Sequence, residues 1–165
     1  MRKVWGESEK AGTAFTLIEL TIVIAVIGIL ATTVFVALQP AKRLADARNA
    51  RRLIDVQNLL IAIKANATNN GGTYLASIAE LTVAMEYQIG TAVIGCDSGC
   101  TAVTTEAACA DLTGLVPAGY LGAIPTDPST GTAAETDYYV IRNASGTVTI
   151  GTCDSEGGVN AVVSQ

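Results

Sequence analysis

The feature that most constrains this chain is an apolar segment near its N-terminus that holds a single carboxylate. Residues 15–38 carry one charged side chain, Glu19, and the polar side chains that follow it are three threonines, Thr21, Thr32 and Thr33. As an α-helix, residues 20–38 would extend about 28 Å, close to the roughly 30 Å hydrocarbon core of a bilayer. We therefore expect a membrane-spanning helix.

Three interpretations of this segment treat its length and its acid differently. A secretory signal peptide would have a shorter apolar run followed by a small-residue cleavage site, and no such site directly follows Leu38. A plain anchor explains the length but not Glu19, because an ionisable residue in an apolar span costs about 2.5–3.5 kcal/mol and usually has a partner. The third interpretation, an anchor whose acid has a partner, explains both the length and Glu19. For Glu19 itself, the simpler alternative is that it lies one turn from the membrane edge and its side chain reaches water.

The residues around Glu19 favour the interpretation in which it has a partner. A short basic leader, the sequence Phe15-Thr16-Leu17-Ile18-Glu19-Leu20 and an apolar helix follow one another. Over residues 12–40 this arrangement resembles the N-terminus of type IV prepilins, shared by type IV pilins and the pseudopilins of type II secretion. The resemblance implies that a prepilin peptidase cuts between Ala14 and Phe15, that the new amino group of Phe15 is N-methylated, and that the anchor stays on the mature chain. The family usually has Gly where this chain has Ala14.

The same resemblance gives Glu19 a role in assembly. Cleavage would place an ammonium group on Phe15, one helical turn from Glu19. In this family the Glu of one subunit is thought to face the N-terminus of its neighbour as a filament grows. Because an unpaired carboxylate in hydrocarbon is penalised, a subunit at the correct axial position relieves that cost and a slipped subunit does not. Glu19 would therefore set the register between subunits.

The helix is expected to continue beyond the apolar segment, with weak points at Gly28 and at Pro40, which lacks an N–H group and disturbs the preceding turn. Residues 41–67 form an amphipathic pattern, and the sequence Asn-Ala-Thr-Asn-Asn-Gly-Gly at 66–72 ends it. The apolar positions recur every three or four residues: Leu53, Val56, Leu60, Ile63 and Ala67. Charged side chains are assigned to the other faces: Arg48, Arg51, Arg52, Asp55 and Lys64.

Charge is divided unevenly along the chain. Residues 39–64 hold six basic and two acidic side chains, whereas residues 65–165 hold one basic and ten acidic ones. The basic cluster at 42–52 has two interpretations: a solvated face attracted to anionic lipid headgroups, or a surface that pairs with the acidic heads of neighbouring subunits. The formal net charge of −5 and the absence of a direct nucleic-acid motif disfavour a nucleic-acid partner. The chain has no histidine and no evident pair of catalytic acids, so we expect no enzyme.

The remaining residues predict a small globular head. Short helices are expected at 74–87 and 105–115, and strands at 138–142 and 147–151, joined by a turn at 143–146. Asn143-Ala144-Ser145 also fits a glycosylation acceptor, although turn chemistry explains it more simply. The predicted fold class is α+β, a long N-terminal helix packed on a small antiparallel sheet, as in type IV pilins. The predicted organisation is a leader (1–14), a transmembrane and assembly helix (15–40), its amphipathic continuation (41–67) and the head (68–165).

Four cysteines lie in the predicted head: Cys96, Cys100, Cys109 and Cys153. Their even number suits disulfides formed in an oxidising compartment. Three connectivities are possible. We favour Cys96–Cys100 with Cys109–Cys153, which would tie the final strand to the variable loop. A zinc site is the rival interpretation, but the spacing lacks paired C-x2-C knuckles.

A second resemblance concerns the end of the chain. Residues 120–128 look like the stretch before the sheet in major pseudopilins, and residues 151–158 are similar to their calcium-binding loop. Asp154 and Glu156, with loop carbonyls, could supply part of the oxygen ligand set that calcium needs. The simpler alternative, which we favour, is an acidic surface turn. No other cofactor is expected.

Taken with the resemblance, the sequence predicts a structural subunit of a type IV pilus-like filament for adhesion, twitching motility or DNA uptake. Its expected partners are identical or related subunits, the prepilin peptidase, an assembly platform with its ATPase, and membrane lipid before assembly. It would begin as a single-pass inner-membrane protein with its head outside the cytoplasm, then enter an extracellular pilus or a periplasmic pseudopilus. The alternatives are a type II secretion pseudopilin and, more distantly, a monomeric membrane-anchored binding module.

Overall fold

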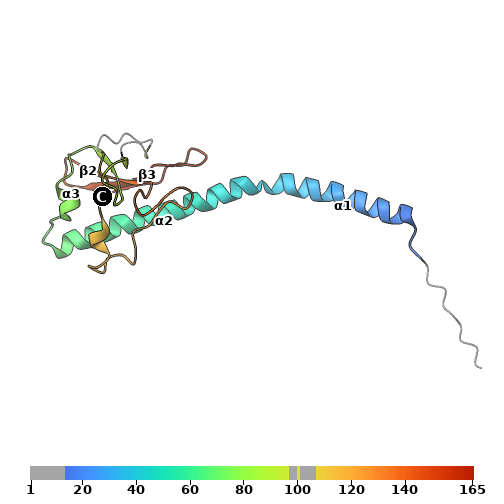
Figure 1. Ribbon diagram of the computed structural model, residues 1–165, viewed down its shortest axis with the longest axis horizontal. Helices are drawn as coiled ribbons and strands as arrows, with labels where there is room; N and C mark the ends of the chain where they lie inside the picture. The colour runs from blue at the N-terminus through green and yellow to red at the C-terminus, as the bar shows by residue number, and fades with distance from the viewer. Residues whose placement is uncertain (1–13, 97–99, 101–106) are drawn as a thin grey trace, which may run out of the picture. The chain divides into compact units, whose positions relative to one another are not determined.

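A computed structural model describes residues 14–96, 100 and 107–165 of the chain (Figure 1). The predicted leader, residues 1–14, therefore lies outside the described residues except for Ala14. The chain divides into two compact units, residues 1–40 and 41–165.

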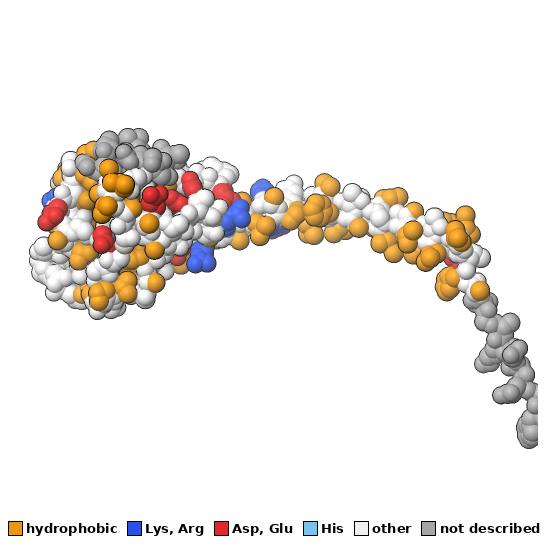
Figure 2. All heavy atoms as spheres, viewed as in Figure 1, with side chains coloured by type: hydrophobic (Ala, Val, Ile, Leu, Met, Phe, Trp, Pro, Cys, Tyr) orange, Lys and Arg blue, Asp and Glu red, His pale blue; other side chains and the backbone are white. Residues whose placement is uncertain are grey.

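The first unit consists, in its described part, of helix α1 (Leu17–Leu38) and the residues beside it. Its apolar side chains cover the surface of the helix, and none of its residues is buried (Figure 2). The threonine hydroxyls donate to backbone carbonyls within the helix, Thr21 to Leu17 at 2.8 Å and Thr33 to Leu30 at 2.8 Å. Threonine is tolerated in an apolar span because its hydroxyl is satisfied in this way. The helical stretch Leu17–Asn69 contains a window long and apolar enough to cross a membrane.

The interruption predicted near Pro40 lies one residue earlier. Gln39 caps the C-terminus of α1 in the left-handed conformation, with φ 43° and ψ 61°. Pro40 is the first residue of α2 (Pro40–Asn69), a position where its missing N–H is not needed. Gly28, by contrast, lies inside α1 without ending it.

The second unit combines α2 with a four-stranded antiparallel sheet. The strands are β1 (Glu86–Gln88), β2 (Tyr138–Arg142), β3 (Val148–Thr152) and β4 (Val162–Ser164), in the order β1-β2-β3-β4. The predicted hairpin is confirmed: Val140 lies opposite Ile150, and Gly146 makes the turn with φ 80°. A short helix, α3 (Ala76–Ala79), and a 3-10 turn, η1 (Thr113–Leu115), complete the described elements. The α+β prediction is thus confirmed.

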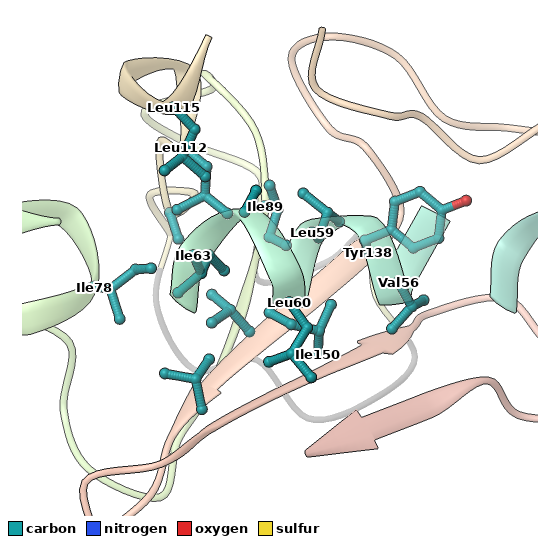
Figure 3. Packing of buried hydrophobic residues seen from close by; sticks show 14 of the residues in the cluster. Val56, Leu59, Leu60, Ile63, Ile78, Ile89, Leu112, Leu115, Tyr138 and Ile150 are labelled. Atoms are coloured by element: carbon teal, nitrogen blue, oxygen red, sulfur yellow. The ribbon is translucent and has the colours of Figure 1, made fainter. Parts of the chain in front are cut away.

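The core forms between one stripe of α2 and one face of the sheet (Figure 3). The α2 stripe contributes Val56, Leu59, Leu60 and Ile63, and the strands contribute Tyr138, Val140 and Ile150. The core is closed by residues of α3, η1 and the loops beside β1 and η1: Ile78, Ile89, Leu112 and Leu115. The 3.6-residue helical period and the two-residue strand period bring these positions to one interior.

The helix predicted at 74–87 is mostly wrong. Helical structure is limited to α3, and Glu86–Gln88 form an edge strand instead. Residue Ala84 adopts a φ of 63°, which no α-helix allows, and its amide donates to the Arg142 carbonyl. Pairing with β2 therefore decided the conformation of this segment. Of the helix predicted at 105–115, residues 105 and 106 lie outside the described part, and the rest forms only η1.

Candidate functional site

The predicted processing and assembly residues lie at the start of α1. Ala14, Phe15 and Thr16 precede the first helical residue, and all three are exposed. An exposed, non-helical peptide bond between Ala14 and Phe15 is the geometry that a peptidase can enter. Glu19 is also exposed, in the first turn of the helix.

Thr16 and Glu19 contact each other at the helix N-terminus. The Glu19 amide donates to the Thr16 hydroxyl oxygen at 3.2 Å, and the hydroxyl lies 3.5 Å from Glu19 Oε2. The sequence Thr16-x-x-Glu19 is a capping-box signal, which was not among the predicted features. The helix dipole also favours a negative charge at this end. Within the described residues Glu19 forms no ion pair.

A second group of charged side chains lies in the other unit, between α2 and two loops. At its centre Arg52, 1% exposed, binds Asp127 with two hydrogen bonds, Nε to Oδ2 at 2.5 Å and Nη2 to Oδ1 at 3.0 Å. Asp127 Oδ1 also accepts from the amide of Ser129 at 2.8 Å. Burial by itself raises the pKa of Asp127, but the hydrogen bonds from Arg52 and Ser129 outweigh it and hold that pKa below the usual range.

A glycine shapes the loop that carries Asp127. A Cβ at Gly131 would overlap the Asp127 amide nitrogen and the Thr136 carbonyl oxygen. The Asp127 amide donates to that same carbonyl at 2.9 Å. Only glycine therefore allows the loop to close tightly enough to present Asp127 to the helix.

The C-terminal loop is joined to α2 by the neighbouring arginine. Arg48 donates to both carboxylate oxygens of Glu156, at 2.6 Å to Oε1 and 2.5 Å to Oε2. Asn49 donates to the Glu156 carbonyl at 2.7 Å and accepts from Arg52 at 2.9 Å. The hydrogen bond from Arg48 lowers the pKa of Glu156. Arg48, Asn49 and Arg52 thus hold the two loops that carry Asp127 and Glu156 against α2.

The predicted faces of this part of α2 are partly wrong. Arg52 lies on the core stripe, four residues before Val56, whereas Leu53 is 42% exposed. Arg48 and Arg52 find their acids within the same chain rather than forming a solvated face. The spacing does indicate a core position for Arg52, because it lies four residues before Val56 and therefore on the same side of the helix. The spacing along the helix does not show that Asp127 lies against Arg52, and this acid is what makes burial of the arginine tolerable.

The predicted calcium ligands do not fit a calcium site in this arrangement. Both carboxylate oxygens of Glu156 face the Arg48 guanidinium, and a divalent cation beside them would be repelled by that charge. Asp154 Oδ2 accepts from the Thr130 hydroxyl at 2.9 Å. In the described ranges no group of three or more His, Cys, Asp or Glu side chains is placed to hold a metal ion.

All four cysteines form disulfides, but the favoured pairing is wrong. The structure joins Cys96 to Cys109 and Cys100 to Cys153, with Cα–Cα distances of 5.3 and 4.9 Å. The first pairing follows from backbone contacts between the two segments, because the Cys109 amide donates to Ala92 and the Cys96 amide donates to Ala107. In the second, Cys100 and Cys153 pack with Tyr139 of β2. Spacing along the chain carries none of this information.

No family model, curated protein or solved structure matched this chain in our comparisons.

Proposed function

We propose that this chain is a structural subunit of a type IV pilus-like filament. It is cut by a prepilin peptidase between Ala14 and Phe15, methylated at Phe15 and assembled through α1. The observation that carries the proposal is an entirely exposed apolar helix that opens with a carboxylate. The ATPase and the platform protein that drive assembly are separate partners, and the chain has no catalytic role.

The energetics of α1 support this proposal. A helix of 22 residues with no buried side chain must be covered by lipid or by other apolar helices. Lipid satisfies the apolar side chains but not Glu19, whose carboxylate is costly in hydrocarbon without a partner. The amino group of Phe15 on an adjoining subunit supplies that partner. Extraction of the helix from the membrane into a filament thus satisfies both requirements at once.

The structure of the second unit, which contains the head and most of α2, is consistent with a filament whose subunits expose their heads. Residues 41–165 have their own core and two disulfides, and they need no contact with α1 to bury it. Disulfides persist in oxidising compartments outside the cytoplasm. A stapled head on a membrane-anchored helix suits a subunit whose head forms the outer surface of a fibre.

A type II secretion pseudopilin is the alternative filament subunit. The resemblance of residues 120–128 and 151–158 to major pseudopilins favours it. Against it stands the C-terminal loop, which is held by Arg48 and Arg52 rather than arranged to bind calcium. The location of the fibres separates the two: a pilus is recovered by shearing the cell surface, whereas a pseudopilus remains in the periplasm.

One measurement tests the proposal directly, the intact mass of the chain isolated from sheared fibres and from membranes. The mature chain should begin at Phe15, weigh one methylene more than the unmodified sequence, and lack two hydrogens for each of its two disulfides. Recovery of fibres built from this mature chain supports the proposal. A chain that retains residues 1–14 in the cell envelope, or that stays monomeric, would favour a membrane-anchored binding module instead.

A further inference from the structure

Helix α2 has a second apolar face, turned away from the core. Ile54 is 56% exposed and Ile61 is 65% exposed. They are seven residues apart, two helical turns, so they lie on the same side of α2. Ala47 and Ala50 fall on this side as well and are exposed, and the exposed polar residue Asn58 lies between the two isoleucines. We call the two isoleucines and the two alanines the outer face of α2. A helix that only supports a core would carry charged side chains here.

The outer face borders a groove in the same unit. The groove has a volume of about 320 Å³ and a mostly apolar lining from Ala50, Leu53 and Val159. Its polar lining residues are Asp46, Asn49 and Asn160. Leu53 and Val159 are both exposed. An apolar ridge beside an apolar groove offers shape as well as surface to a partner.

The charges around the outer face are not balanced within the chain. In the described residues Arg48 and Arg52 bind Glu156 and Asp127, whereas Lys42, Arg43 and Lys64 form no ion pair. Arg43 lies in line with the outer face, four residues before Ala47. Among the described residues Asp46, one helical turn from Lys42 and Arg43, also forms no ion pair. Three basic side chains and one acidic one therefore surround the outer face, which leaves a net positive charge.

The acidic surplus lies elsewhere in the same unit. Glu80 and Asp111 form no ion pair within the described residues, and both are exposed. They line one groove of about 410 Å³ together with Leu81 and Tyr87. This groove combines negative charge with apolar and aromatic side chains, which complements the outer face of α2.

We propose that the outer face of α2 docks a second copy of this chain, against the acidic head surface that carries Glu80 and Asp111. The inference rests on the proposed function and adds to it the surfaces through which heads contact each other. Because the two surfaces differ, the contact is head-to-tail. A contact of this kind repeats from copy to copy and gives an open helical fibre where its rotation does not close a ring. The unlike charges orient the subunits, and the isoleucines supply the apolar burial.

A lipid surface is the competing partner for a basic, apolar helix face. The outer face spans 15 residues from Ala47 to Ile61, about 21 Å of helix, and is long enough to lie flat on a lipid surface, so its length does not decide between the two partners. The charge does, because anionic lipid would repel a unit in which residues 65–165 carry ten acidic side chains and one basic one. A second copy satisfies both the apolar strip and the charge.

Photo-cross-linking in cells tests the inference with the full-length chain. A benzophenone amino acid replaces Ile61, and in a matched control it replaces Ile94, another exposed isoleucine of the same unit. We expect the substitution at position 61 to give an adduct of twice the chain mass, joined to residues 65–165 of the second chain, and position 94 to give little. Adducts with lipid, with another protein or with α1, or equal yields from both positions, would overturn the inference.

Fibre yield gives a second, independent test. Replacing Ile54 and Ile61 by Ser should lower the yield of sheared fibres at least about tenfold, because two apolar side chains no longer lose water at the contact. Ile94→Ser should leave the yield unchanged. Correct mass of the membrane-held variant shows that processing is intact. If wild-type fibres form and the double variant matches them, the inference fails while the proposed function stands. If the wild-type chain forms no fibres, both fail.

Discussion

Arg52 and Asp127, 75 residues apart in sequence, form a buried two-point ion pair that joins the long helix of the head to the loop before β2. Both side chains are almost completely inaccessible to water. A buried pair of this kind adds less to stability than its Coulomb energy suggests, because both charges lost their hydration. Removing one partner is costly, because the other charge is then left unpaired in the interior.

Removing one partner of this pair should therefore destabilise the head strongly. We expect Arg52→Met to lower the free energy of unfolding by about 3–5 kcal/mol. The double variant Arg52→Met with Asp127→Asn should lose much less than the sum of the two single changes. Chemical denaturation of the full chain in detergent, followed by circular dichroism, measures these differences.

Arg51 provides a matched control for that experiment. Its side chain is 68% exposed and lies 3.7 Å from Asp55. An exposed pair contributes about 0–1 kcal/mol, so Arg51→Met should be nearly neutral. Equal effects at positions 51 and 52 would contradict the burial and pairing described for Arg52.

The stability contributed by Asp127 should depend on pH in a defined direction. Its pKa is lowered in the folded head by Arg52 and Ser129 despite burial, so the folded state binds a proton less readily than the unfolded chain. The contribution is fully present above the ordinary carboxyl pKa of about 3.9 and is lost as the pH falls through the lower folded value. The gap in stability between wild type and Asp127→Asn should therefore shrink on acidification below about pH 4. A gap that widens there would contradict the lowered pKa.

Asp137 should behave in the opposite way. Burial raises its pKa, and Gln88 Nε2 donates to its Oδ1 at 3.0 Å. A raised folded pKa means that stability is lost as the pH rises through that value. Asn fits the φ of 60° at this position and carries no charge. Asp137→Asn should thus raise the melting temperature at pH 7 and have little effect at pH 3. If Asp137→Asn stabilised the protein as much at pH 3 as at pH 7, the negative charge of Asp137 would not be the cause.

The disulfide pairing leads to a prediction about both linkage and stability. Peptide mapping without reduction should recover Cys96 linked to Cys109 and Cys100 linked to Cys153. The second bond has a sequence separation of 53 against 13. Loop entropy predicts that replacing its two cysteines by serine costs about 1 kcal/mol more than the same change in the first. A peptide that links Cys96 to Cys100 would disprove the pairing.

Variants of Glu19 can separate its charge from its capping contact with Thr16. Gln retains a side chain suited to the capping box, whereas Ala does not. If the charge pairs with Phe15 of a neighbour, both Glu19→Gln and Glu19→Ala should allow synthesis and cleavage but reduce the fibre yield. Thr16→Ser, which keeps the hydroxyl, is the control. Normal fibres from Glu19→Gln would show that the negative charge is not needed.

The sequence by itself determined the features that depend on neighbouring residues. Residues 15–38 could form little but an apolar helix, the strands around Gly146 followed from alternation and a turn, and most of the core stripe of α2 was visible from its spacing. The prepilin-like motif around Glu19 was visible too, although its capping contact with Thr16 was overlooked. Each of these features arises within a few turns of helix or one hairpin, so local pattern is sufficient to predict it.

The tertiary structure decided what depends on residues far apart in the chain. Whether Arg52 lies in water or in the core depends on Asp127, which no local pattern brings to it. The cysteine pairing depends on which backbone segments lie side by side, and β1 is a strand because β2 offers it an edge. Glu156 could look like a calcium ligand in sequence, yet Arg48 occupies its carboxylate in the fold. The physical reason is the same in each case: a charge, a thiol or a strand edge is satisfied by whatever partner the folded chain places against it.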